Sequence, residues 1–157
     1  MQKKIAEKDK SRFMTAGVLA IAAAHFIHDV YSAFLAPLLP LLIEKLSLTL
    51  TQAGFLSTVM QLPALINPFI GNLADRLYLR YFIILAPATT AVPMSLLGAA
   101  PNYGVLLILL FVTGISVSIF HGPAPVMVAE FSGPRKGRGM SIFMTGGELA
   151  RTVGPLC

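Results

Sequence analysis

Long apolar runs separated by short polar breaks dominate the sequence. A helix needs about 20 mostly apolar residues to cross a hydrocarbon core of about 30 Å. We place four complete runs and part of a fifth at 14–42, 52–74, 81–100, 103–129 and 140–157. The pattern predicts an all-α membrane protein that crosses the bilayer at least four times.

The breaks between these runs are short, and they leave no room for a polar domain. They fall at 44–51, 75–80, 101–102 and 130–139. Prolines inside the runs would break helices in water, but neighbouring helices of a membrane bundle satisfy the carbonyls that proline leaves free. Pro123 and Pro125 follow His121 closely, so we expect them to disturb the helix beside that histidine.

Composition agrees with this pattern and excludes several classes of function. The chain is 55% hydrophobic and 12% charged, with a mean hydropathy of +0.75, which is unlike a soluble domain. Its net charge of +5 comes from short basic clusters between apolar runs, so we expect no nucleic-acid partner. The single cysteine is the last residue, Cys157, which leaves no disulfide framework and no redox motif, and we expect no cofactor.

The basic clusters alternate along the chain, which predicts its orientation. Cytoplasmic loops of membrane proteins carry an excess of Lys and Arg. The segment 1–13 and the second and fourth breaks hold nearly all basic residues outside the runs, whereas the first and third breaks hold only Lys45. We therefore predict a cytoplasmic basic N-terminus, with the second and fourth loops on the same side. A cleaved signal peptide would share the N-terminal lysines, but the first apolar run continues far beyond Ala24.

Six ionisable residues lie inside the runs and are the candidates for chemistry. At about 1.5 Å per residue, all of them fall about 12 to 24 Å into the membrane. Run one carries His25, His28 and Asp29 on one helical face, run four carries His121, and run five carries Glu148 and Arg151 at a spacing that allows pairing. Because such residues are costly at this depth, they predict a polar cavity shared by runs one, four and five. Runs two and three should then offer only lipid or packing faces.

Two other interpretations of these residues are open. Glu148 and Arg151 could simply neutralise each other while the histidines bond to backbone carbonyls. The His25-x-x-His28-Asp29 pattern could also belong to a membrane enzyme that binds a metal. The chain has three histidines and no cysteine at ligand spacing, so we expect no metal.

Two polar breaks resemble loop signatures of the major facilitator superfamily. Residues 71–76 read Gly-Asn-Leu-Ala-Asp-Arg, which is similar to the family's motif between its second and third helices. The chain keeps Gly71, Asp75, Arg76 and Arg80, but it has Tyr and Leu at 78–79 where the family pattern has Gly and a basic residue.

The resemblance continues after runs four and five. Glu130 and Arg138 are similar to the acidic residue and the Arg-Gly that follow the family's fourth helix. This implies a cytoplasmic latch in which Glu130 pairs with a basic residue of the second loop. Gly154 and Pro155 resemble the antiporter signature of helix five, although Ala150 stands where a glycine is expected.

Several longer segments narrow the resemblance to the fosmidomycin-resistance branch of the family. They are residues 25–31, 34–40, 121–125 and 140–152. Members of that branch are twelve-helix efflux proteins, so the chain would hold the first four helices and part of a fifth. We therefore expect the functional molecule to be longer and to include C-terminal helices that this sequence lacks.

The resemblance implies proton-coupled efflux of a drug or small anionic compound, by alternating access, in the inner membrane of a bacterium. Asp29 and Glu148 are the candidate proton carriers, because a carboxyl group in a medium of low dielectric can hold a proton at working pH. Arg151 and the histidines could meet an anionic group of the substrate. The alternatives are a proton-coupled importer, the membrane enzyme mentioned above, and a fragment without activity of its own.

Overall fold

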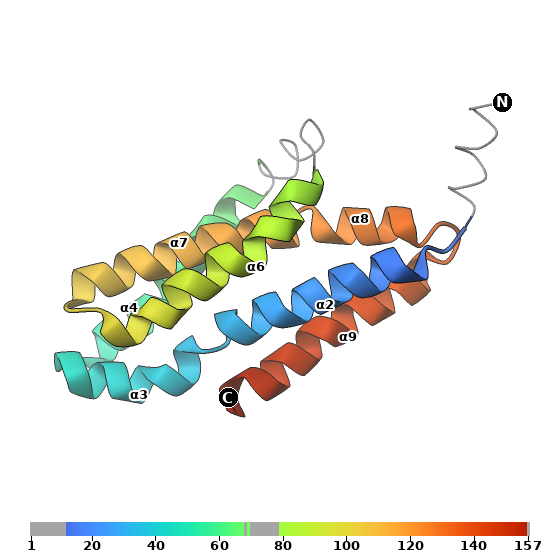
Figure 1. Cartoon of the computed structure of the whole chain (residues 1–157). Coiled ribbons are helices and arrows are strands. Elements are labelled where there is room, and N and C mark those ends of the chain that lie inside the picture. The colour runs from blue at the N-terminus through green and yellow to red at the C-terminus, as the bar shows by residue number, and fades with distance from the viewer. Residues whose placement is uncertain (1–11, 68, 70–78, 157) are drawn as a thin grey trace.

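The computed structural model describes residues 12–67, 69 and 79–156, and every regular element within these residues is a helix (Figure 1). The prediction of an all-α chain is confirmed. The α-helices are α2 (Thr15–Ser32), α3 (Leu35–Leu46), α4 (Leu50–Gln61), α6 (Leu79–Leu96), α7 (Tyr103–His121), α8 (Ala124–Phe131) and α9 (Lys136–Val153). Three short 3-10 helices, η1 (Leu62–Ile66), η2 (Leu97–Ala99) and η3 (Gly154–Leu156), extend α4, α6 and α9.

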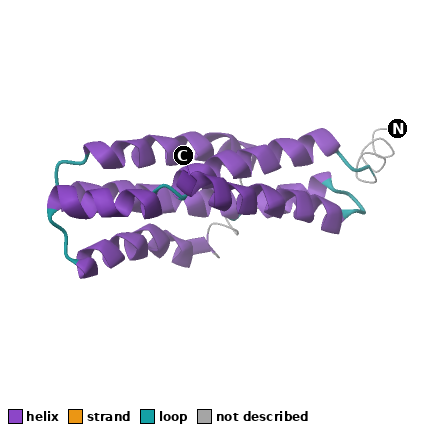
Figure 2. Ribbon diagram, turned by 90° about the horizontal axis from the view of Figure 1, so that it is seen from below, coloured by secondary structure: helices purple, strands orange, loops and turns teal. Residues whose placement is uncertain are grey.

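The long helices lie side by side in a bundle (Figures 1 and 2). Helix α9 packs on α2, α2 packs on α6, α6 packs on α7, and α7 packs on α4. Helix α3 continues from α2 after a bend, and α8 follows α7 in the same way. Helix α2 therefore has α9 on one side and α6 on another, which makes it the helix through which polar groups of several runs can meet.

The first run differs from the single span predicted at 14–42. It forms two helices that are separated at Ala33 and Phe34, and the second of them continues to Leu46. Pro37 has no N–H to bond to the carbonyl of Ala33, and its ring crowds that carbonyl, which explains the break there. The two helices together form a 32-residue stretch, Thr15–Leu46, that is long and apolar enough to cross a membrane.

The fourth run breaks where the sequence predicted a disturbance. Helix α7 ends at His121 and α8 begins at Ala124, with Gly122 and Pro123 between them. The stretch Tyr103–Phe131 is the second one in the described residues that is long and apolar enough to span a membrane, while Leu50–Ile66 and Ile83–Ala99 are shorter apolar helices. The fifth run starts at Lys136, earlier than the predicted 140.

Contacts at the two ends of the bundle match the alternation of loops predicted from charge. At one end, Lys45 Nζ donates to the carbonyl oxygens of Gly98 and Ala100 at 2.8 and 2.9 Å, which joins the first break to the end of the third run. At the other end, the backbone N–H of Met14 donates to the carbonyl of Phe131 at 2.8 Å, which joins the start of the first run to the fourth break. Which of these ends faces the cytoplasm stays a prediction.

Two apolar clusters hold the bundle together. One joins α3, α4, α6, η2 and α7 and consists of Leu35, Leu42, Leu48, Leu56, Met94, Leu97, Ala100, Leu106 and Leu110. The other joins α2, α6, α7, α8 and α9 and consists of Ile21, Ile83, Ala86, Phe120, Ala124, Val128 and Phe143. Large apolar side chains also lie outside, for example Ile108 at 65% exposure, as expected of helices that face lipid or further helices.

Candidate functional site

Asp29 lies at the centre of a buried polar cluster. Asp29 is only 2% exposed, and three imidazoles surround its carboxyl group. His28 Nδ1 and His121 Nε2 lie 3.1 and 3.2 Å from Asp29 Oδ1, and His25 Nε2 lies 3.2 Å from Asp29 Oδ2. The structure thus brings together four of the six ionisable residues singled out in the sequence.

Local helix geometry places these side chains. His25, His28 and Asp29 project from one face of α2 because residues three and four apart lie above one another on a helix. His121 is the last residue of α7, directly before the break at Gly122. Helix α9 approaches closely because it presents glycine here: a Cβ on Gly147 would lie 2.4 Å from Cε1 of His25.

Each buried histidine has a second partner that orients its ring. His25 Nδ1 lies 2.9 Å from the backbone carbonyl oxygen of Phe143 in α9, and the two rings stack at 4.1 Å. His28 Nε2 lies 3.0 Å from the hydroxyl of Thr90 in α6, and its ring stacks on Phe120 at 4.6 Å. Both imidazoles are therefore held from two sides.

A chain of hydroxyl groups continues from His28, and the sequence analysis did not find it. Thr90 Oγ1 donates to Ser116 Oγ at 2.8 Å, Ser116 Oγ donates to the carbonyl of Ala86 at 3.0 Å, and Thr89 Oγ1 lies 2.6 Å from Ser116 Oγ. Run three therefore contributes to the polar cluster, contrary to the expectation that it offers only lipid or packing faces. The signal was the pair Thr89 and Thr90 in an otherwise apolar run; counting only ionisable residues missed it.

Glu148 and Arg151 pair with each other, as their spacing predicted, but they lie outside the buried cluster. Arg151 Nη1 donates to Glu148 Oε1 at 3.3 Å, and both side chains are 64% exposed. Arg151 also reaches the cluster, since its Nε lies 3.9 Å from Asp29 Oδ2. Arg151 is thus the link between the exposed face of α9 and the buried carboxylate.

Three of these residues also have the chemistry of a metal-binding site. Donor atoms of His25, Asp29 and His121 all lie within 4.8 Å of one another. The Arg151 guanidinium, 3.9 Å from the same carboxylate, places a fixed positive charge beside that position and so opposes a second cation there. The contacts described above are those of a hydrogen-bonded and ion-paired cluster.

The loop motifs are only partly covered by the structure. Gly71, Asp75 and Arg76 lie outside the described residues, as does the side chain of Arg80. Glu130 is exposed near the end of α8, and the guanidinium of Arg138 lies 5.3 Å from the centre of the Phe13 ring. The latch between Glu130 and the second loop stays a prediction.

The helix-five motif packs directly against the first run. Gly154 is buried, and a Cβ there would lie 2.9 Å from the Cβ of Ala33 and 3.1 Å from the carbonyl oxygen of Val30. Pro155 lies in η3 beside it. The small residue therefore permits α9 to meet α2 where α2 ends.

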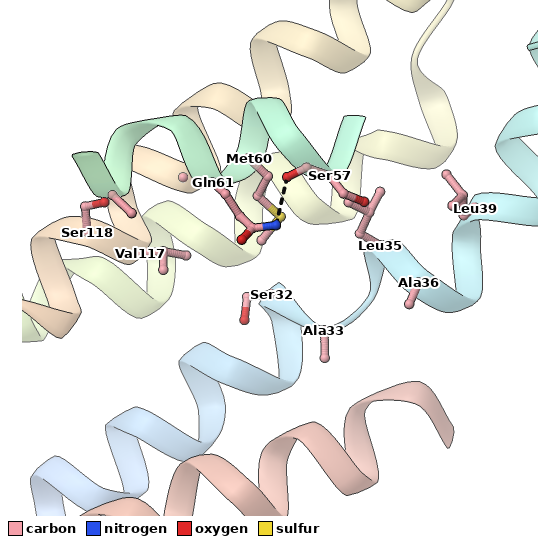
Figure 3. A pocket seen from close by; sticks show the side chains of 12 residues that line it. Ser32, Ala33, Leu35, Ala36, Leu39, Ser57, Met60, Gln61, Val117 and Ser118 are labelled. Atoms are coloured by element: carbon pink, nitrogen blue, oxygen red, sulfur yellow. Dashed lines mark hydrogen bonds between the residues drawn. The ribbon is translucent and has the colours of Figure 1, made fainter. Parts of the chain in front are cut away.

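A cavity of about 380 Å³ opens one helical turn from Asp29 (Figure 3). It lies between the bend that joins α2 to α3, helix α4 and helix α7, and its lining is mostly apolar. Run two therefore lines a cavity, contrary to the expectation that it offers only lipid or packing faces. Its polar lining groups are Ser32, Ser57, Gln61 and Ser118. Ser32 Oγ donates to the backbone carbonyl of Asp29 at 3.1 Å, and Ser118 Oγ is buried without a hydrogen-bond partner among the described residues.

Several bacterial proteins are similar to most of this chain. The chain is 30% identical to the fosmidomycin resistance protein of Escherichia coli over 89% of its length, and 27% identical to the uncharacterized MFS-type transporter YfnC of Bacillus subtilis over 88%. It is also 27% identical, over 83% of its length, to the multidrug resistance protein MdtG of Serratia proteamaculans.

The chain spans about a third of the length of these relatives, and no solved structure matches it. The family model of the Major Facilitator Superfamily matches residues 21–157, which include the whole Asp29 cluster. With its helical bundle, its membrane-length apolar stretches and these relatives, the chain belongs to the Major Facilitator Superfamily, a family of multi-pass membrane transporters.

Proposed function

We propose that the whole protein exports a drug or small anionic compound in exchange for protons, by alternating access. The observation that carries this proposal is the buried carboxyl group of Asp29, ringed by three imidazoles where α2, α7 and α9 meet. Carboxyl and imidazole groups clustered inside a membrane protein are the groups that bind and release protons in transporters. A change in their protonation would alter which conformation the bundle prefers.

The cavity beside this cluster is the proposed position for part of the substrate. Its apolar lining would contact the carbon skeleton, while Ser32, Gln61 and Ser118 offer hydrogen bonds. Ser118 is suited to a ligand because its buried hydroxyl has no partner in the described residues. Ser32 connects the cavity to the backbone of Asp29, so occupation of the cavity and protonation of the cluster can influence each other.

The name of the Escherichia coli relative supports fosmidomycin, a phosphonate, as the first substrate to test. The Arg151 guanidinium and the imidazoles are the groups of this chain that would attract such an anion. The names of the second and third relatives support transport in general and multidrug export.

The test uses the full-length protein reconstituted in lipid vesicles with an imposed pH gradient. We expect accumulation of fosmidomycin when protons can flow in the opposite direction, and none after a protonophore collapses the gradient. Accumulation in the same direction as the proton flow would indicate an importer. No transport of any anionic or apolar drug in either direction would overturn the proposal.

A further inference from the structure

The two sides of the Asp29 carboxyl group differ in the hydrogen that each partner can supply. On the Oδ2 side lies His25, whose other ring nitrogen faces the Phe143 carbonyl at 2.9 Å. A carbonyl oxygen can only accept, so Nδ1 of His25 must carry its hydrogen. A neutral His25 therefore has a bare lone pair on Nε2, and this lone pair faces Asp29 Oδ2 at 3.2 Å.

This contact is unfavourable unless a proton lies within it. An ionised carboxylate and an unprotonated imidazole nitrogen are both acceptors, so they repel when they face each other. His25 Nε2 is buried and has no hydrogen-bond partner of good geometry in the described part of the chain. One proton, on either atom, converts the contact into a hydrogen bond or an ion pair and removes the cost of the unpaired group.

The Oδ1 side is not fixed by a carbonyl bonded directly to the ring. As described, Thr90 Oγ1 donates to Ser116 Oγ, so it accepts from His28 Nε2, and Nδ1 of a neutral His28 then lacks a hydrogen. Unlike a carbonyl, these hydroxyls can rotate: if Ser116 donates to Thr90 instead of to the Ala86 carbonyl, Thr90 donates to His28 Nε2, and Nδ1 of His28 carries the hydrogen and donates to an ionised Asp29. His121, half-buried, also has no described carbonyl partner that would fix its tautomer, so it too can donate to Oδ1.

We infer that His25 and Asp29 together hold the coupling proton, between Nε2 and Oδ2, because the Phe143 carbonyl fixes the tautomer of His25. This inference rests on the proposed function for its role in transport. The proton adds to a pair made of neutral His25 and ionised Asp29. Its release restores both groups, and no bond between heavy atoms forms or breaks. The other charged or titratable groups that face the pair are His28 on α2, His121 on α7 and Arg151 on α9, with Glu148 bound to Arg151.

A spectroscopic test reads the pair directly. The three histidines of this chain all belong to this cluster, and in the whole protein the ¹⁵N signals of His25 are assigned as those that disappear in His25→Asn. In the whole protein in lipid vesicles, we expect His25 Nδ1 to be protonated at every pH tested, because the Phe143 carbonyl oxygen that faces it can only accept. Nε2 should gain its proton in one step, and Asp29→Asn should remove that step, because the amide can donate to Nε2 without an added proton.

Two results would overturn the inference, whatever the protein transports. One is a protonation step of His25 Nε2 that survives in Asp29→Asn. The other is a His25 ring that carries its hydrogen on Nε2 alone. A wild-type protein without gradient-dependent transport would instead overturn the proposed function and leave the spectroscopic result standing.

A transport test uses His25→Asn with His121→Asn for comparison. The asparagine amide nitrogen can keep the bond to the Phe143 carbonyl while Nε2 is removed. We expect gradient-driven export to fall by about a hundredfold, the scale of losing a group that transfers protons, while substrate exchange without a gradient continues. His121→Asn should retain the Nε2 step of His25. Export by His25→Asn with the wild-type dependence on the gradient would overturn the inference.

Discussion

Two acidic residues at the same predicted depth have opposite surroundings. Asp29 is 2% exposed and contacts three imidazoles, whereas the side chain of Glu148 is 64% exposed and contacts one guanidinium. Arg151 touches both, at 3.9 Å from Asp29 and 3.3 Å from Glu148. Depth along the helix is therefore a poor guide to environment, because the face that a residue occupies decides whether neighbouring helices cover it.

The buried and the exposed contacts should differ in how much they stabilise the protein. Exposed ion pairs contribute about 0 to 1 kcal/mol, since water and salt screen them. A buried carboxylate that loses its partners keeps its desolvation cost, which makes the cluster sensitive to single changes. We therefore expect substitutions near Asp29 to have large effects and substitutions at Glu148 to have small ones, and the following four changes test that order.

The largest effect is expected from Asp29→Asn. The amide imitates the protonated acid but cannot release a proton, so gradient-driven export should fall by about a hundredfold or more, as for other losses of a proton-transfer group. Substrate binding and exchange without a gradient should remain. Flux measured in vesicles with and without a pH gradient separates these quantities. Normal gradient-driven export would remove Asp29 as a carrier and leave Glu148 as the candidate.

The second change, Gly147→Ala, disturbs the cluster through packing alone, because it alters no charge and no hydrogen-bonding side chain. The added Cβ would lie 2.4 Å from Cε1 and 2.7 Å from Nε2 of His25, so either the ring or α9 must move. We expect a loss of about 1 to 3 kcal/mol in stability, as for overpacked cores, measured by denaturation in detergent. Gly54→Ala is the matched control, because a Cβ on Gly54 meets nothing within 4 Å. Equal stability of the two variants would contradict the described contact between α9 and α2.

Arg151→Gln should have an intermediate effect, and it tests which acid the arginine serves. If its contact with Asp29 is the important one, the change removes a positive charge from the cluster and alters the pH at which export is fastest. If its contact with Glu148 is the important one, Glu148→Gln should produce the same alteration. Profiles of export rate against pH for the two variants decide between these cases, and we expect only Arg151→Gln to shift the profile.

The smallest effect is expected from Glu148→Gln. The side chain is 64% exposed and its one described side-chain partner is Arg151, so stability should change by less than about 1 kcal/mol. Gradient-driven export should be affected far less than by Asp29→Asn. A loss as large as that of Asp29→Asn would break the distinction between the two acids and would indicate that further helices cover Glu148 in the whole protein.

The sequence predicted the helical class, and it grouped His25, His28 and His121 with Asp29 around one polar cavity. The i, i+3 and i+4 spacing of His25, His28 and Asp29 requires a shared face on any α-helix, and the depth of His121 made it a reasonable neighbour. The breaks near Pro37 and Pro123 also follow from chemistry local to the chain, although only the second was expected. The family could be inferred in the same way, since its motifs are contiguous segments of sequence.

Other features depended on which helices pack together. The Phe143 carbonyl has no side-chain signature, and only the contact between α2 and α9 places it beside His25. Thr90 and Ser116 belong to helices α6 and α7, and their hydroxyls are ordinary until His28 lies next to them.

By itself, then, the sequence determined the helices, the rows of polar residues along them and the family, because periodicity, proline chemistry and motifs act over short distances. Tertiary structure alone decided that Asp29 is enclosed while Glu148 is open, and that the tautomer of His25 is fixed. The physical reason is that burial and hydrogen-bond partners depend on the rotation and separation of neighbouring helices. Small residues such as Gly147 allow the approach, but the packing of the whole bundle sets it.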